Sequence, residues 1–146
     1  MNDGPGWPVL DDCETLIETG EELQWRQINP QHLDSDLNGA HITPLAFQDS
    51  TRRVSTSRSS LISAAQAYDY HVNVAQRASA GTWAVSVDEI KAASCRAIDD
   101  RACDGVETPA HSYIDMRGLD RTQRRVARVE LATRATVRGR HHPPAK

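Results

Sequence analysis

The stretch VSTSRSSLISAAQAYDYH, residues 54–71, places a strand directly before a helix. Its first four residues are β-branched or hydroxyl-bearing, which is typical of an edge or half-buried strand. Ser63 is followed three positions later by Gln66, the pattern of a capping box at a helix N-terminus, and the alanines around them favour helix. We therefore predict a strand at 54–57 and a helix from Ser63 to about Ala78.

The same capping pattern recurs twice further along the chain. Ser86 and Glu89 form a second pair at the end of an alternating strand predicted at 82–87, so a short helix should begin there. Asp120 and Gln123 form a third pair, which begins a final helix. Each pair satisfies backbone amide groups that a helix N-terminus leaves without partners.

Two further segments have the character of strands, and two have the character of loops. LQWRQI at 23–28 alternates between apolar and polar residues, and HSYIDM at 111–116 forms a short strand. Residues 31–50 are predicted to be a loop with at most one short helical turn and one short strand. Residues 96–110 are charged and rich in turn formers, which predicts a surface loop.

This order of elements predicts an α+β fold in a single domain over residues 21–138. A small mixed or antiparallel sheet should carry about three helices, packed on one face. Residues 1–20 are rich in glycine, proline and acidic residues, so we expect a poorly ordered N-terminal lead there. Residues 139–146 are expected to form a frayed basic tail.

Composition and cysteine usage predict a cytoplasmic bacterial protein with no membrane partner. No apolar run approaches the ~18 residues that cross a bilayer, and the acidic N-terminus lacks the features of a secretory signal. Cys13, Cys95 and Cys103 are odd in number and form no CxxC pair, so we expect three thiols in a reducing cytosol. Arginine outnumbers lysine by fifteen to two, which is typical of GC-rich bacterial genomes.

Several common kinds of active site have no signature in this chain. There is no GxSxG nucleophile elbow and no GxxxxGK[ST] phosphate-binding loop. The six histidines lack metal-ligand spacing, and we predict no metal site. The adjacent carboxylates of Asp99 and Asp100 diverge in direction, so we expect both to be solvated rather than to form an acid–base pair.

Charge is divided unevenly along the chain. Residues 117–146 carry nine Lys or Arg against two acidic residues, a balance of +7, whereas residues 1–116 balance at −10. The basic segment predicts an amphipathic C-terminal helix, whose arginines either offset the acidic body or contact a nucleic acid. Its expected packed face is Leu119, Val126, Val129, Thr133 and Val137, and its partner-binding face is Arg121, Arg124, Arg125 and Arg128.

One set of residues has the order found in an enzyme family. Arg26 in a strand, Ser55-Thr56-Ser57 in a later strand and Glu89 beyond them resemble the arginine, serine-threonine-serine and glutamate of mono-ADP-ribosyltransferases. The resemblance implies NAD as a cofactor, with Arg26 binding its phosphates, Ser55 supporting the site and Glu89 acting in catalysis. The E-x-E or Q-x-E turn of that family is replaced here by Asp88-Glu89.

The chain also resembles short uncharacterised bacterial proteins that begin with a W/Y-R-Q-hydrophobic-x-P pattern, through LQWRQINP (23–30), PLAFQ (44–48), GTWAVSVDEI (81–90) and HSYID (111–115). This resemblance spans residues 21–138 and implies no activity. We therefore expect a small α+β domain that acts through protein–protein contacts. An ADP-ribosyltransferase-like enzyme using NAD and a nucleic-acid-associated protein are the alternatives.

Overall fold

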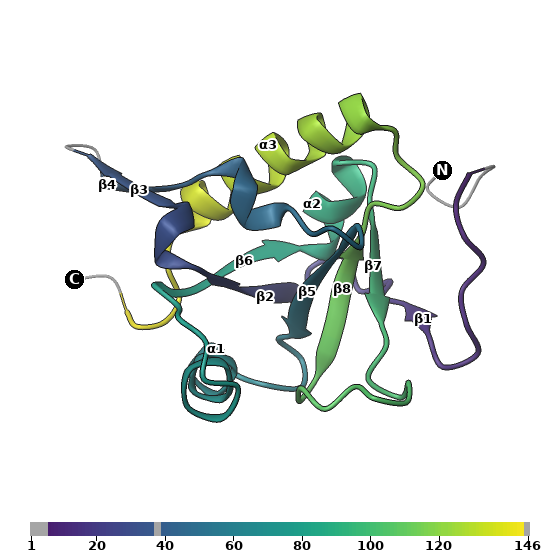
Figure 1. Ribbon diagram of the computed structural model, residues 1–146, viewed down its shortest axis with the longest axis horizontal. Helices are drawn as coiled ribbons and strands as arrows, with labels where there is room; N and C mark the ends of the chain where they lie inside the picture. The colour runs from purple at the N-terminus through teal and green to yellow at the C-terminus, as the bar shows by residue number, and fades with distance from the viewer. Residues whose placement is uncertain (1–5, 37–38, 145–146) are drawn as a thin grey trace.

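The computed structural model describes residues 6–36 and 39–144. Its central element is an antiparallel sheet of six strands (Figure 1). The strand order is β1-β7-β8-β5-β2-β6, so most neighbouring strands are distant in sequence. A separate two-stranded sheet pairs β3 with β4. The strands are β1 (Thr15–Leu16), β2 (Leu23–Ile28), β3 (Leu33–Asp36), β4 (Gly39–Ile42), β5 (Arg53–Arg58), β6 (Gly81–Ser86), β7 (Arg96–Asp99) and β8 (His111–Asp115).

Three α-helices pack on the six-stranded sheet and cover both of its faces (Figure 1). α2 (Val87–Ala92) and α3 (Arg121–Arg138) lie on one face. α1 (Ala64–Asp69) lies on the other and continues into a π-helical turn at Tyr70–Val74. The predicted α+β class and single domain are confirmed, whereas the expectation that all helices share one face is wrong. Within the described ranges, no helix is long and apolar enough to cross a membrane.

Two apolar clusters hold these layers together. The larger lies between the sheet and helices α2 and α3, and the smaller lies under α1. Burial of this apolar surface is the main source of stability in a domain of this size. Fully buried members of the larger cluster include Phe47, Val85, Ile114 and Leu131, and the smaller cluster is formed by Trp25, Ala67 and Ala84.

All three predicted capping boxes are present. In each, the side chain of the N-cap residue accepts a hydrogen bond from a backbone amide, and the side-chain oxygen of the third helical residue accepts one from the N-cap amide. These contacts join residues three positions apart, which is why the sequence alone was enough to place the helix starts. The pairs are Ser63 with Gln66, Ser86 with Glu89 and Asp120 with Gln123.

The prediction that residues 96–110 form a surface loop is wrong for the start of this segment, which is strand β7. β7 is buried along its whole length between β1 and β8. Its charged ends tolerate burial because each has a partner: Arg96 Nη2 lies 2.5 Å from Asp115 Oδ2, and Arg58 Nη1 lies 2.8 Å from Asp99 Oδ2. The expectation that Asp99 is solvated is wrong for the same reason.

The expected N-terminal lead contributes to the domain through its described part, residues 6–20, and residues 1–5 lie outside the described residues. β1 pairs with β7 and Ile17 is only 3% exposed, so the domain begins before residue 21. Cys13 and Cys103 form a disulfide, which contradicts the prediction of three thiols. Cys95 is a buried thiol, and burial raises its pKa to about 12. Because disulfides persist mainly in oxidising compartments, cysteine usage no longer supports a cytoplasmic location.

α3 packs through small side chains rather than through the predicted valines. Val126, Val129 and Val137 are 64%, 49% and 82% exposed. Alanine has no side-chain atoms beyond Cβ, so an alanine-lined face lets the helix approach its neighbours closely. Because alanine is only weakly apolar, the sequence pattern did not indicate this face. The buried residues are Ala127, Leu131, Ala132 and Ala135, and Leu119, before the helix, is buried as expected.

The chain beyond α3 runs back along the edge strand β6. Thr82 N donates to His142 O at 2.7 Å, and His141 N donates to Thr82 O at 2.8 Å. The tail, which was expected to fray, is therefore hydrogen-bonded to the sheet at His141 and His142. The last two residues of the predicted tail lie outside the described residues.

Candidate anion-binding pocket

A pocket of about 870 Å³ opens on the face of the sheet that carries α1. Residues of β2 and β5 form its floor, and α1 with the π-helical turn forms one wall. The loop that precedes β8 forms another wall, and Figure 1 shows this loop on the same side of the sheet as α1. These segments are far apart in sequence, so the pocket exists only in the folded domain.

Arg26 reaches this pocket from β2 and has no acidic partner. Its Nε donates to Ala46 O and its Nη1 to Ser55 O, both at 2.9 Å. Burial lowers the pKa of Arg26 to about 10, and the negative charge of Asp49 only partly opposes this effect. Among the residues that the structure describes, no carboxylate forms an ion pair with Arg26. A half-buried guanidinium held only by backbone carbonyls leaves donors available to a negatively charged ligand.

Two further basic side chains, Arg77 and His71, line the same pocket. Burial lowers the pKa of His71, and the positive charges of Arg77 and Arg26 lower it further, although a hydrogen bond to the Ala78 backbone opposes them. The imidazole is therefore neutral at pH 7, because burial and the neighbouring positive charges both disfavour its protonated form. The two arginines give the pocket positive charge, which the carboxylates of Asp49 and Glu107 in its lining oppose.

β5 presents Ser55 and Ser57 to the pocket and Thr56 to the opposite face. Thr56 Oγ1 lies 2.7 Å from Ser112 Oγ in the buried layer on that face. Successive side chains of a strand alternate in this way, so Ser55 and Ser57 share the pocket face, although Ser55 is exposed there and Ser57 is only 8% exposed. The structure thus brings Arg26 and Ser55 together, as the transferase resemblance implied.

Glu89 does not join them. It begins α2 on the other face of the sheet, where its Oε1 accepts from Ser86 N at 2.8 Å and from Arg138 Nη2 at 2.5 Å. Burial raises the pKa of Glu89, but the Ser86 amide and the Arg138 guanidinium outweigh burial and hold the pKa below its usual range. The predicted catalytic carboxylate therefore caps a helix and pairs with α3, outside the pocket.

A different carboxylate lines the pocket. Glu107 lies in the loop that precedes β8, beside Gly105 and Thr108. No local sequence pattern distinguishes Glu107 from other charged residues of 96–110, and only the position of β8 in the sheet brings its loop to the pocket. Sequence reasoning missed both Glu107 and His71 for this reason.

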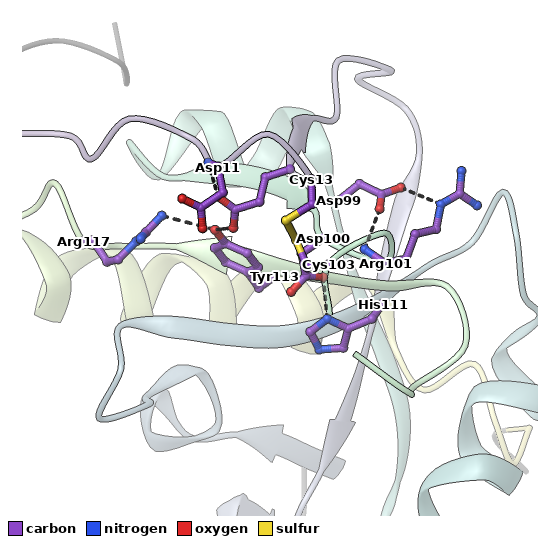
Figure 2. The surroundings of a disulfide bond; sticks show 10 residues. Asp11, Cys13, Asp99, Asp100, Arg101, Cys103, His111, Tyr113 and Arg117 are labelled. Atoms are coloured by element: carbon purple, nitrogen blue, oxygen red, sulfur yellow. Dashed lines mark hydrogen bonds and ion pairs between the residues drawn. A yellow bond between two sulfur atoms is a disulfide. The ribbon is translucent and has the colours of Figure 1, made fainter. Parts of the chain in front are cut away.

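Figure 2 shows how this loop is held. Asp100 Oδ1 lies 2.6 Å from His111 Nδ1, and both residues are at the ends of the segment that contains the loop. Between them, Cys103 is bonded to Cys13. The disulfide and the Asp100–His111 contact together attach this wall of the pocket to the N-terminal segment and to β8.

The predicted partner-binding arginines lie on α3, away from the pocket. Burial lowers the pKa of Arg124, and the positive charges of Arg52 and Arg128 lower it further. These cations repel one another, and the negative charge of Asp120 only partly opposes the effect on Arg124. Arg121 and Arg125 are exposed, whereas Arg124 and Arg128 are half-buried.

No family model, curated protein or solved structure matches this chain. In residues 6–36 and 39–144, no group of three or more His, Cys, Asp or Glu side chains is arranged to hold a metal ion.

Proposed function

We propose that the protein binds an anionic small molecule in this pocket, with phosphate or carboxylate oxygens contacting Arg26 and Arg77. The observation that carries the proposal is the half-buried Arg26 guanidinium, which has two backbone carbonyls as partners and no ion pair among the described residues. Burying an unpaired charge is costly, and an anion that enters the pocket offsets this cost. Guanidinium also presents parallel N–H groups that match phosphate and carboxylate.

The neighbouring groups suit the same kind of ligand. Ser55 and Ser57 offer hydroxyl donors on the pocket floor, and His71 becomes a further cation once an anion offsets the charge of its neighbours. NAD, which the transferase resemblance implies, carries a pyrophosphate of this class. Since Glu89 lies outside the pocket, NAD enters the proposal as a candidate ligand, without a catalytic role for Glu89.

Isothermal titration calorimetry with inorganic pyrophosphate, ADP and NAD tests the proposal. We expect binding of at least one of them, weakened about tenfold or more by Arg26→Gln, because one charge-assisted contact contributes about 1.5–3 kcal/mol. Arg77→Gln should also weaken binding, and this variant should keep the fold intact because Arg77 is exposed. Arg134→Gln on α3 is the matched control and should bind normally. Absence of heat with all three probes, or equal affinity in Arg26→Gln and Arg77→Gln, would show the proposal to be wrong.

A second proposal concerns the arginine cluster on α3, which suits an acidic protein surface. Its support is the mutual repulsion of the positive charges around Arg124, together with the exposed apolar side chains of Val126 and Val129 beside it. Protein interfaces combine apolar contact with complementary charge, whereas a nucleic-acid surface gives exposed valines no role. This is the protein-contact function expected from the charge distribution of the sequence.

Fluorescence anisotropy distinguishes the two macromolecular partners. We expect a glutamate- and leucine-rich peptide to bind, with an affinity that falls as salt increases and is lost in the double variant Arg121→Glu, Arg125→Glu. A DNA duplex of equal net charge is the second arm. If the duplex binds more tightly than the peptide, the nucleic-acid alternative replaces the protein-contact proposal.

A further inference from the structure

His111 lines the pocket and is oriented by a carboxylate. Its Nδ1 lies 2.6 Å from Asp100 Oδ1, and the two side chains are only 17% and 14% exposed. A neutral imidazole that donates its Nδ1 hydrogen to a carboxylate keeps a lone pair on Nε2. His111 is therefore arranged to accept a proton from a group in the pocket.

Ser57 lies opposite His111 in the β5–β8 ladder. Arg58 N donates to Ala110 O at 3.0 Å, so the adjacent pair of Ser57 and His111 is not hydrogen-bonded through the backbone. In such pairs the Cα atoms are about 4.5 Å apart and the side chains are closest. Both side chains line the pocket, and within the described part of the chain the Ser57 hydroxyl has no hydrogen-bond partner.

We propose that Ser57 is a nucleophile, that His111 is its general base and that Asp100 positions His111. The substrate class is a carboxylic ester that carries an anionic group, so the inference rests on the proposed anion-binding function. Trp25 is opposite Ser57 in the β2–β5 pairing, which places Arg26 one residue from the partner of the nucleophile. The Arg26 guanidinium thus lies in the same pocket and stabilises negative charge on the substrate.

The reaction needs no reactant besides the ester and water. The Ser57 oxygen adds to the ester carbon while its proton moves to His111 Nε2. The bond from carbon to the alcohol oxygen breaks, and His111 gives its proton to that oxygen, which leaves an acylated Ser57 and the free alcohol. Water then adds to the acyl carbon and gives a proton to His111. That proton returns to the Ser57 oxygen as the carboxylic acid departs.

Labelling with phenylmethanesulfonyl fluoride tests the nucleophile without knowledge of the natural ester. The Ser57 oxygen bonds to sulfur, the sulfur–fluorine bond breaks, fluoride leaves and His111 takes the proton. We expect one sulfonyl adduct, located at Ser57 by peptide mass spectrometry, absent in Ser57→Ala and retained in Ser55→Ala. An adduct elsewhere, or no adduct at all, would overturn the proposal.

The roles of the other two residues have separate readouts. His111→Gln should slow labelling about 100-fold, the usual contribution of a positioned base. Asp100→Asn should slow it as well, and Asp100→Glu should restore part of the rate, which a purely structural role would not require. Thermal unfolding confirms that each variant is folded. A labelling rate unchanged in folded His111→Gln would remove the base from the proposal and overturn it.

Failure of this proposal is distinguishable from failure of anion binding. Ser57→Ala should still bind inorganic pyrophosphate or ADP in calorimetry, because Arg26 and Arg77 are intact. The same anion should slow sulfonylation of the wild type by occupying the pocket. Anion binding without any Ser57 adduct overturns the catalytic proposal alone, whereas a Ser57 adduct with no anion binding overturns the substrate class.

Discussion

Cys13 is bonded to Cys103 across a sequence separation of 90 residues, with their Cα atoms 5.0 Å apart. Cys103 lies in the segment that contributes Gly105, Glu107 and Thr108 to the pocket. The bond therefore attaches a wall of the pocket to the N-terminal segment, which is itself part of the sheet through β1. Stability and pocket shape should both depend on the oxidation state of this pair.

Reducing this bond should destabilise the domain. A cross-link that closes a loop of this length removes conformational freedom from the unfolded chain, and the expected loss in the free energy of unfolding is about 4 kcal/mol. Urea unfolding with and without dithiothreitol measures it, and Cys103→Ser should reproduce the reduced state. Cys95→Ala is the control and should remain sensitive to dithiothreitol. Coincident unfolding curves in both conditions would contradict the prediction.

Asp115 is the centre of a buried charge cluster and should be intolerant of neutralisation. It is fully buried, and it accepts from Arg96 Nη2 at 2.5 Å and from Arg117 Nε at 2.8 Å. Asp115→Asn leaves a buried guanidinium without its counter-charge, which typically costs about 3–5 kcal/mol. Chemical unfolding measures the change, and Asp104→Asn on the exposed loop should leave stability unaltered.

The same cluster predicts the direction of acid unfolding. Burial raises the pKa of Asp115, but hydrogen bonds and charge from Arg117 and Arg96 outweigh burial and hold the pKa below its usual range. A carboxyl with a depressed folded-state pKa contributes stability that is present above its unfolded pKa, about 3.9, and is lost as pH falls through the folded pKa. Stability against urea should therefore fall below about pH 4 less steeply in Asp115→Asn than in the wild type. Equal slopes would contradict this assignment.

Because α3 buries one face and exposes the other, substitution of two of its apolar residues should affect stability very differently. Leu131 is fully buried, so Leu131→Ala should cost about 2–5 kcal/mol in the free energy of unfolding. Val129 is 49% exposed, so Val129→Ala should change it by less than about 0.5 kcal/mol. Urea unfolding of the two variants compares them directly. A larger loss in Val129→Ala would support the face predicted from the sequence.

Local contacts explain what could be predicted from the sequence. The capping box of Ser63 and Gln66 joins residues three apart, and the strand before it is marked by its own composition. Buried β7 could not be recognised, because Arg96 and Asp99 resemble surface residues until their partners on other strands are known. The disulfide could not be predicted either, because its two cysteines are far apart in sequence and only the fold brings them together.

Only those residues of the candidate site that lie on adjacent strands of the sheet could be predicted from the sequence. Arg26 and Ser55 come from adjacent strands β2 and β5, so the transferase resemblance placed them together. His71 and Glu107 reach the same pocket from a π-helical turn and a loop, which have no pattern that indicates where they point. Glu89 has a local capping role that accounts for its place in the sequence, and that role keeps it out of the pocket.

Anion binding should strengthen as pH falls, through His71. Its pKa is lowered by burial and by the charges of Arg77 and Arg26, so the imidazole of the free protein is neutral at pH 7. A bound anion favours the protonated ring and raises that pKa, so binding takes up a proton and is favoured at lower pH. Sulfate is a suitable probe because its charge is constant between pH 5.5 and 8, a range chosen around the ordinary histidine pKa of about 6.5. Calorimetry across this range should show tighter binding at the acidic end, and His71→Gln should flatten the trend. A slope that is unchanged in His71→Gln would show that another group in the pocket titrates on binding.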